Sequence, residues 1–152
     1  TSIMGTLAGL SERMDVIFPV HPRTWKQMVS FGILEKTKQS PRLMITDPMN
    51  YLDTICLVEK ARFVITDSGG LQEETTYLKI PCLTVRPNTE RPVTINQGTN
   101  KLTSMEELST DIEHILNGFS RRSEIPELWD GNAGHRIINE LINFTEENSF
   151  SS

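Results

Sequence analysis

Apolar residues occur along the chain in short continuous runs, and a segment with helical spacing follows most of these runs. Unbroken apolar runs of this length are typical of strands that are buried on both faces. We expect strands over residues 15–20, 42–45, 62–66 and 81–85, and residues 99–103 are a candidate for a last strand. Because strands and helices alternate, the pattern predicts an α/β, Rossmann-like fold, in which a parallel sheet carries helices on both faces.

The segments around these strands carry apolar residues at spacings of three and four, which indicates amphipathic helices. We expect helices over residues 6–13, 25–31, 51–60, 70–78 and 132–144, together with a short helix that ends near residue 98. Ser104 and Glu107 form a capping box before one more helix, whose apolar face begins at Leu108. Four apolar residues of the last helix are expected to face inward: Ile137, Ile138, Leu141 and Ile142.

We expect a single domain over residues 1–145 and a polar, frayed tail over residues 146–152. The pattern begins with a helix, whereas a doubly wound domain normally opens with a strand. Thr1 is not an initiator methionine, and no signal peptide follows it. We therefore expect that the first strand of the domain lies outside this sequence, and that the chain is a piece of a longer protein or a processed chain.

The composition narrows the range of functions. The formal net charge is -5 and no run of basic residues exceeds two, which argues against a nucleic-acid surface. No apolar run is long enough to span a membrane. Cys56 and Cys82 lie in apolar segments and predict two buried thiols of a cytoplasmic protein, without a disulfide framework. The three histidines are far apart and have no cysteine nearby, so we expect no metal site.

Polar clusters follow four of the predicted strands, at the point where each strand ends. They begin at His21, Asp47, Asp67 and Arg86. Ligands of open parallel sheets bind at the carboxyl ends of the strands, so we expect these clusters to line one crevice. His21 is a candidate catalytic residue of that crevice, and a purely structural histidine is the alternative.

Ser68, Gly69 and Gly70 stand between a predicted strand and a predicted helix. Glycines allow the backbone to approach an anion closely, and the start of a helix directs unpaired N–H groups at the same place. We expect a phosphate cradle there, to which the helix dipole contributes about 0.3–1 kcal/mol at an exposed site. A plain strand-to-helix turn that is capped by Asp67 or Ser68 is the alternative.

Glu73 and Glu74 follow the glycines, and Arg86 and Arg91 follow the next strand. An acidic residue in a first helical turn complements the helix dipole, and we assign this role to Glu73. A carboxylate can also accept hydrogen bonds from ribose hydroxyls, and we assign this role to Glu74. Arginine suits a diphosphate because its planar fork donates several hydrogen bonds, whereas a surface ion pair such as Glu90 with Arg91 is the alternative.

Three segments of the chain resemble a known family. ITDSGGLQEETTYLKIPCLTVRPNTERP, residues 65–92, resembles the signature of the non-hydrolysing UDP-N-acetylglucosamine 2-epimerases. FPVHPRT at residues 18–24 and WDGNAGHRI at residues 129–137 are similar to two further parts of the family's pattern. The resemblance is in register over nearly the whole chain, and it implies the second, C-terminal half of a GT-B fold, in which two Rossmann-like domains face each other across a cleft.

The resemblance also implies an activity and a site. The family interconverts UDP-N-acetylglucosamine and UDP-N-acetylmannosamine by eliminating UDP and adding it back, and it uses no redox cofactor. By position, Ser68–Gly70 resembles the family's diphosphate cradle, Glu74 its ribose carboxylate, and Arg91 the basic group of its UDP-sugar site, with His21 nearby. Residues 47–54 resemble the uracil side of the family's site, although Met49 and Thr54 replace the glutamine and the aromatic residue of many relatives.

Partners follow from the same resemblance. The family's catalytic carboxylates belong to its first domain, and its His-Arg-x-Glu-Asn motif precedes the part that this chain matches. We therefore expect the chain alone to bind UDP weakly and not to epimerise UDP-N-acetylhexosamines. Relatives commonly pair as homodimers, which makes a homodimer the candidate assembly. Two other functions stay open, a GT-B UDP-sugar glycosyltransferase domain and a non-enzymatic nucleotide-binding module, although the run from Asn88 to Pro92 favours the epimerase over the transferase.

Overall fold

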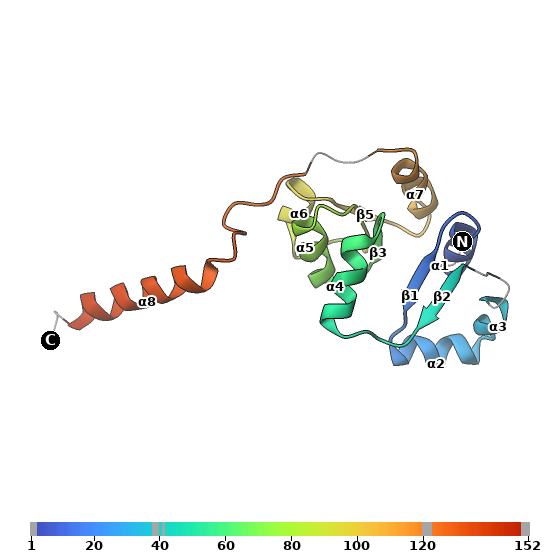
Figure 1. Ribbon diagram of the computed structural model, residues 1–152, viewed down its shortest axis with the longest axis horizontal. Coiled ribbons are helices and arrows are strands. Elements are labelled where there is room, and N and C mark those ends of the chain that lie inside the picture. Colours follow the sequence, from blue (N-terminus) through green and yellow to red (C-terminus); the bar gives the residue numbers. More distant parts are fainter. Residues whose placement is uncertain (1–2, 38–39, 41, 120–122, 150–152) are drawn as a thin grey trace.

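The computed structural model describes residues 3–37, 40, 42–119 and 123–149 (Figure 1). Its elements in chain order are α1 (Ile3–Ser11), β1 (Val16–Pro19), α2 (Pro22–Ser30), α3 (Ile33–Thr37), β2 (Leu43–Thr46), α4 (Tyr51–Lys60), β3 (Val64–Thr66), α5 (Gly69–Tyr77), β4 (Cys82–Val85), α6 (Pro92–Asn96), β5 (Asn100–Thr103), α7 (Leu108–Leu116) and α8 (Ala133–Ser149). Each predicted strand is present, and most of the predicted helices lie within a few residues of their expected bounds. The short helix α3 is an addition to the predicted pattern.

The strands lie in two parallel sheets, with the orders β1-β2 and β3-β4-β5. Val16 of β1 is in register with Leu43 of β2, and Ile65 of β3 is in register with Leu83 of β4. Because helices separate consecutive strands and each strand pair is parallel, the α/β, Rossmann-like class is confirmed. Among the described residues, β1 pairs with β2 alone and β3 with β4 alone, and Figure 1 shows β1 on the side of its sheet that faces β3.

One hydrophobic core joins the two sheets. Leu7 and Leu10 of α1 belong to the same buried cluster as Leu108 and Ile112 of α7. Strand residues of both sheets complete the cluster: Val16, Leu43 and Leu83. A leucine as fully buried as Leu108 contributes roughly 2 kcal/mol to folding. The shared core therefore holds the two sheets as one unit.

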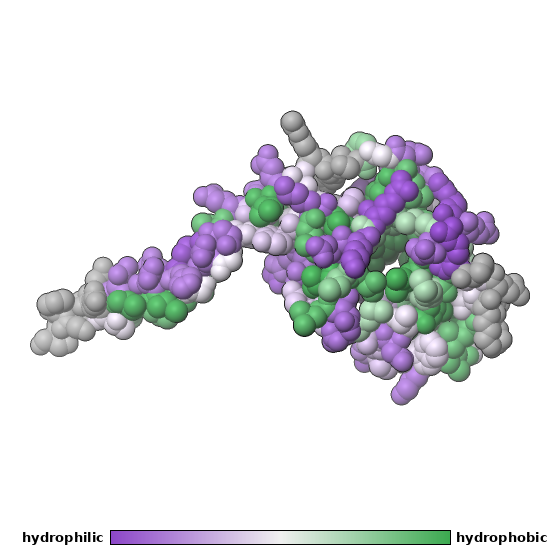
Figure 2. Space-filling model, viewed as in Figure 1, coloured by the Kyte–Doolittle hydropathy of each residue, from purple (hydrophilic) through white to green (hydrophobic). Residues whose placement is uncertain are grey.

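Helix α8 stands away from this unit (Figure 1). The four residues that we expected to face inward are exposed, with Ile137 at 60%, Ile138 at 56%, Leu141 at 59% and Ile142 at 49%. Figure 2 shows an apolar stripe along one side of this helix, and the spacing of the four residues puts them on one side of it. The inward orientation is wrong for the described residues, because periodicity identifies an apolar stripe but not the surface that covers it.

Two further expectations also need correction. The last helix continues to Ser149, so residues 146–149 are helical and are not a frayed tail, while residues 150–152 lie outside the described residues. Cys56 is exposed, because it lies on the outer side of α4, whereas Cys82 in β4 is buried as expected. Burial raises the pKa of the Cys82 thiol. In the part of the chain that the structure describes, no helix is long and apolar enough to cross a membrane.

Candidate nucleotide-binding site

The turn between β3 and α5 has the geometry of an anion-accepting helix start. Ser68 is extended, with φ -82° and ψ 131°, and α5 begins at the next residue, Gly69. Ser68 occupies the N-cap position, as the alternative of a plain strand-to-helix turn predicts, but its side chain makes no capping hydrogen bond. The first N–H groups of α5 lack partners within the helix and point toward the carboxyl end of β3. The turn can therefore receive an anion.

A carboxylate of the protein lies against this turn. The side chain of Glu90 occupies the space into which a Cβ on Gly69 would project. Arg86 Nη1 contacts Glu90 Oε2 at 3.0 Å, and both side chains are partly exposed. A hydrogen bond from its own backbone N–H, followed by the nearby charges of Arg86 and Arg91, lowers the pKa of Glu90. Glu90 is therefore held as an anion next to the start of α5.

Arg91 reaches the same helix through a different carboxylate. Its Nε lies 3.2 Å from Oε2 of Glu73. The first turn of α5 contains no acidic residue, since the helix already begins at Gly69, so the dipole role that we assigned to Glu73 is wrong. Both arginines form ion pairs at the surface, as their alternative role requires, although Glu90 pairs with Arg86 and not with Arg91. Glu73 instead holds the guanidinium of Arg91 beside α5.

Glu74 is fixed by a tyrosine that the sequence did not single out. The Tyr51 hydroxyl at the start of α4 donates a hydrogen bond to Glu74 Oε1 at 2.8 Å. This hydrogen bond is the main reason why the pKa of Tyr51 is raised. Tyr77 and Trp129 line a shallow hollow of about 240 Å³ beside Glu73 and Glu74. Helical spacing could have pointed to Tyr77, which lies one turn after Glu73, but it carries no signal for Trp129.

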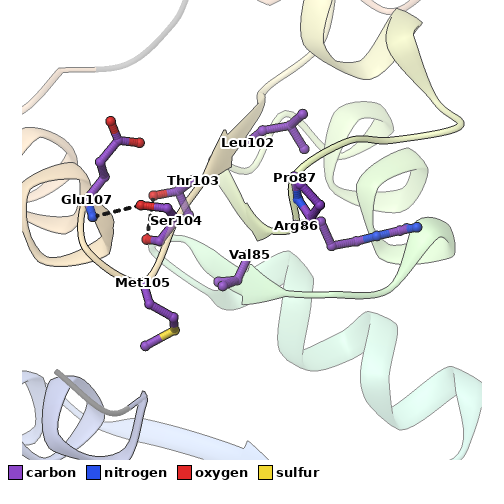
Figure 3. Close-up of a pocket in the computed structure, with 8 residues that line it drawn as sticks. All are labelled: Val85, Arg86, Pro87, Leu102, Thr103, Ser104, Met105 and Glu107. Carbon is purple, nitrogen blue, oxygen red and sulfur yellow. Dashed lines mark hydrogen bonds between the residues drawn. The ribbon is translucent and has the colours of Figure 1, made fainter.

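A second hollow lies at the carboxyl ends of β4 and β5, where Figure 3 shows its lining. Its volume is about 430 Å³, and its walls include Arg86, Thr103, Ser104 and Glu107. Figure 3 shows the Arg86 side chain pointing away from Ser104. The Ser104 hydroxyl accepts a hydrogen bond from the Glu107 N–H at 3.2 Å, as half of the predicted capping box requires.

The two remaining polar clusters provide the N-cap residues of α2 and α4. His21 precedes α2, and its Nδ1 accepts a hydrogen bond from the Arg23 N–H at 3.3 Å. Asn50 caps α4 by accepting from the Asp53 N–H at 2.9 Å, and the Thr54 hydroxyl donates to the Asn50 carbonyl oxygen at 2.8 Å. A role of His21 near Arg91, and a role of residues 47–54 in base binding, stay predictions. Among the described residues, no group of three His, Cys, Asp or Glu side chains could hold a metal ion.

Parallel strands that alternate with helices define a Rossmann-like α/β domain, and the two glycines at the start of α5, with two arginines nearby, form its candidate site at the carboxyl ends of the strands. A family model described as UDP-N-acetylglucosamine 2-epimerase matches residues 1–142, and the chain belongs to this family.

Relatives support the assignment to this family. The chain is 40% identical to the UDP-N-acetylglucosamine 2-epimerase of Methanococcus maripaludis over 82% of its length, and 39% identical to that of Methanocaldococcus jannaschii over 83%. It spans only 34% of each of these relatives. The crystal structure of the M. jannaschii enzyme in complex with UDP-GlcNAc and UDP is similar, with a TM-score of 0.74 and 34% identity, and the match covers 92% of this chain and 38% of that one.

Proposed function

We propose that this chain is the UDP-binding half of a UDP-N-acetylglucosamine 2-epimerase that interconverts UDP-GlcNAc and UDP-ManNAc. The observation that carries the proposal is the turn at Ser68–Gly70, which presents the start of α5 to an anion with Arg86 and Arg91 beside it. The similarity to a relative whose structure holds UDP-GlcNAc and UDP supports the same ligand class.

The site residues have separate roles in this proposal. The N–H groups at Gly69 and Gly70, with the Ser68 hydroxyl, bind the diphosphate. Arg91 balances its charge, since a guanidinium donates several hydrogen bonds to phosphate oxygens. Glu74, which follows by one turn of α5, accepts hydrogen bonds from the ribose hydroxyls. His21 borders the sugar as a candidate for proton transfer.

The reaction explains why such a site would be needed. In the elimination, the bond between C1 of the sugar and the β-phosphate oxygen breaks, and its electron pair leaves with UDP while a base removes the proton on C2. UDP then adds to C1 of the glycal, and a proton returns to the opposite face of C2. Charge builds up on the leaving diphosphate, so donors that are already oriented toward it at the start of α5 stabilise the transition state.

We further propose that the chain works as the C-terminal half of a two-domain GT-B enzyme, which can pair as a homodimer. The chain spans about a third of its relatives, which leaves room for a first domain. A parallel strand between β1 and β3 would join both sheets into one, in the order of a dinucleotide-binding fold. A right-handed crossover through α1 would connect this first strand of the domain to β1.

Calorimetric titration with UDP tests the site. We expect Arg91→Ala and Glu74→Ala each to weaken UDP binding about tenfold or more, because each removes charge-assisted hydrogen bonds worth roughly 1.5–3 kcal/mol. The matched control is Arg42→Ala, which removes an arginine that is paired 3.1 Å from Asp15 near the amino ends of β1 and β2. This variant should bind UDP as the wild type does. Unchanged affinity in both site variants would show that the site is misplaced.

A further inference from the structure

A group of polar side chains is buried beneath the proposed UDP site. Gln72, Thr84, Thr94 and Asn100 are each 0% exposed, and Thr89 is half-buried above them. These residues come from the consecutive elements α5, β4, α6 and β5 and from the loop after β4. We call Gln72, Thr84, Thr89, Thr94 and Asn100 the buried polar network.

Both the oxygen and the nitrogen of each side-chain amide in this network form hydrogen bonds. Gln72 Oε1 accepts hydrogen bonds from the Thr89 hydroxyl at 2.6 Å and from Asn100 Nδ2 at 3.0 Å. Gln72 Nε2 donates to the carbonyl oxygen of Ser68 at 3.3 Å. Asn100 Oδ1 accepts from the Thr84 hydroxyl at 2.7 Å, and Asn100 Nδ2 also donates to the Thr94 hydroxyl oxygen at 3.1 Å.

The network ends at two segments that both belong to the proposed UDP site. One end is the Ser68 carbonyl oxygen, in the turn before α5. The other end is the loop that carries Arg91, because the Arg91 N–H donates to the Thr89 hydroxyl oxygen at 3.0 Å and its carbonyl oxygen accepts from the Thr94 hydroxyl at 2.8 Å. Gln72 thus contacts the Ser68–Gly70 turn directly, and it contacts the Arg91 loop through the hydroxyl of Thr89.

Folding stability alone gives no reason for this arrangement. Apolar side chains of the same size could fill the same space, and buried polar groups are tolerated when they are hydrogen-bonded. What a satisfied polar network adds is a single defined geometry, because each donor and acceptor is bonded only when the segments have the right separation. The network therefore suits a place where two loops must keep a set distance.

We propose that Gln72, oriented by Asn100, is a positioning residue that holds the Arg91 loop at a fixed place relative to the Ser68–Gly70 turn, so that both contact one nucleoside diphosphate. The inference rests on the proposed function for its ligand. Glutamine suits the role because one amide offers an acceptor to Thr89 and a donor to Ser68. Ionised glutamate has the same shape but lacks the donor, and methionine lacks both groups.

The test compares Gln72→Met and Gln72→Glu with Thr75→Val in the 152-residue chain. Thr75 is the matched control because it is equally buried in α5, while its hydroxyl bonds to the carbonyl oxygens of Leu71 and Gln72 within the same helix. We expect both kinds of variant to lower the melting temperature. UDP affinity, measured by calorimetry well below that temperature, should fall about tenfold or more only in the Gln72 variants, since small displacements of binding groups are costly.

A ligand-free measurement separates positioning from general destabilisation. The backbone amide signal of Arg91 in a nitrogen–proton correlation spectrum should shift or broaden in Gln72→Met and stay in place in Thr75→Val. If Gln72→Met does not fold, Thr89→Ala removes the link at the surface of the network, and Thr89→Ser should restore both the signal and the affinity. Folded Gln72 variants with an unchanged Arg91 signal would overturn the inference. Failure of the wild type to bind UDP would count against the proposed function, while the Arg91 signal would still decide the positioning role.

Discussion

The carboxylate of Glu90 lies against the α-carbon of Gly69, in the space that any other residue at position 69 would fill with its Cβ. In this position a carboxylate of the chain stands beside the start of α5, where we propose that a diphosphate binds. Arg86 Nη1 lies 3.0 Å from Glu90 Oε2. When UDP binds, Arg86 would then contact the diphosphate in place of the Glu90 carboxylate. This relationship leads to the first prediction.

Glu90→Gln should bind UDP more tightly than the wild type. The substitution keeps the shape of the side chain but removes a negative charge next to the incoming diphosphate. We expect the Kd measured by calorimetry to fall about two- to fivefold, because a charge near a helix start has a modest effect at an exposed site. Glu113→Gln is the control, since Glu113 forms an ion pair with Arg13 outside the site. Weaker binding of Glu90→Gln would mean that Glu90 assists the ligand.

Gly98→Ala should destabilise the fold. A Cβ at this position would lie 2.5 Å from the backbone carbonyl oxygen of Thr94 and would also collide with Thr76. Because backbone does not move aside easily, we expect a loss of about 1–3 kcal/mol in the free energy of unfolding, measured with urea. Gly9→Ala in α1 has open space around the new Cβ and should gain about 0.5–1 kcal/mol. Equal stability of the two variants would show that a Cβ at position 98 does not collide with Thr94 and Thr76.

The start of α8 should depend on pH through Asp130. Hydrogen bonds from Arg136, at 2.9 and 3.0 Å, and from the Asn132 N–H, at 2.9 Å, hold the pKa of Asp130 well below its ordinary value. Since the folded pKa is lower than the unfolded one, the carboxylate stabilises this turn above the ordinary pKa of about 4 and loses that effect as the pH falls further.

Amide hydrogen exchange at Asn132 and Arg136, whose N–H groups are hydrogen-bonded in this turn, checks this expectation once it is corrected for the intrinsic rate. Protection should be constant between about pH 5 and 8 and should decline below about pH 4. Asp130→Asn should show reduced protection at pH 7, because the neutral amide forms a weaker pair with Arg136. A decline in protection that sets in near pH 6 in the wild type would point to a different titrating group.

The 152-residue chain by itself should not convert UDP-GlcNAc to UDP-ManNAc. We expect the family's catalytic carboxylates to belong to a domain that this chain does not contain, so UDP binding should persist without turnover. Proton nuclear magnetic resonance of the sugar anomeric signals would detect either product or exchange of the C2 proton with deuterium oxide. Steady turnover by the purified chain would refute the assignment of catalysis to another domain.

Periodicity and turn chemistry in the sequence were sufficient for the α/β class, the strands and the strand-to-helix turn at Ser68. Unbroken apolar runs indicated β1 to β4, and the glycines at 69 and 70 marked the start of α5. These features are local, since they depend on a few neighbouring residues and on backbone preferences. Family membership also follows from residues that the sequence displays directly, such as those of segment 65–92.

The partners of side chains depended on the way distant segments pack. The sequence predicted dipole compensation for Glu73 and burial for the apolar stripe of α8, yet Glu73 pairs with Arg91 and the stripe is exposed. The same is true of Gln72, which reads as an ordinary polar helix residue until α5 is placed over β4 and β5. Local patterns specify backbone conformation, whereas hydrogen bonds and ion pairs between residues about 20 positions apart exist only once the hydrophobic core has brought their elements together.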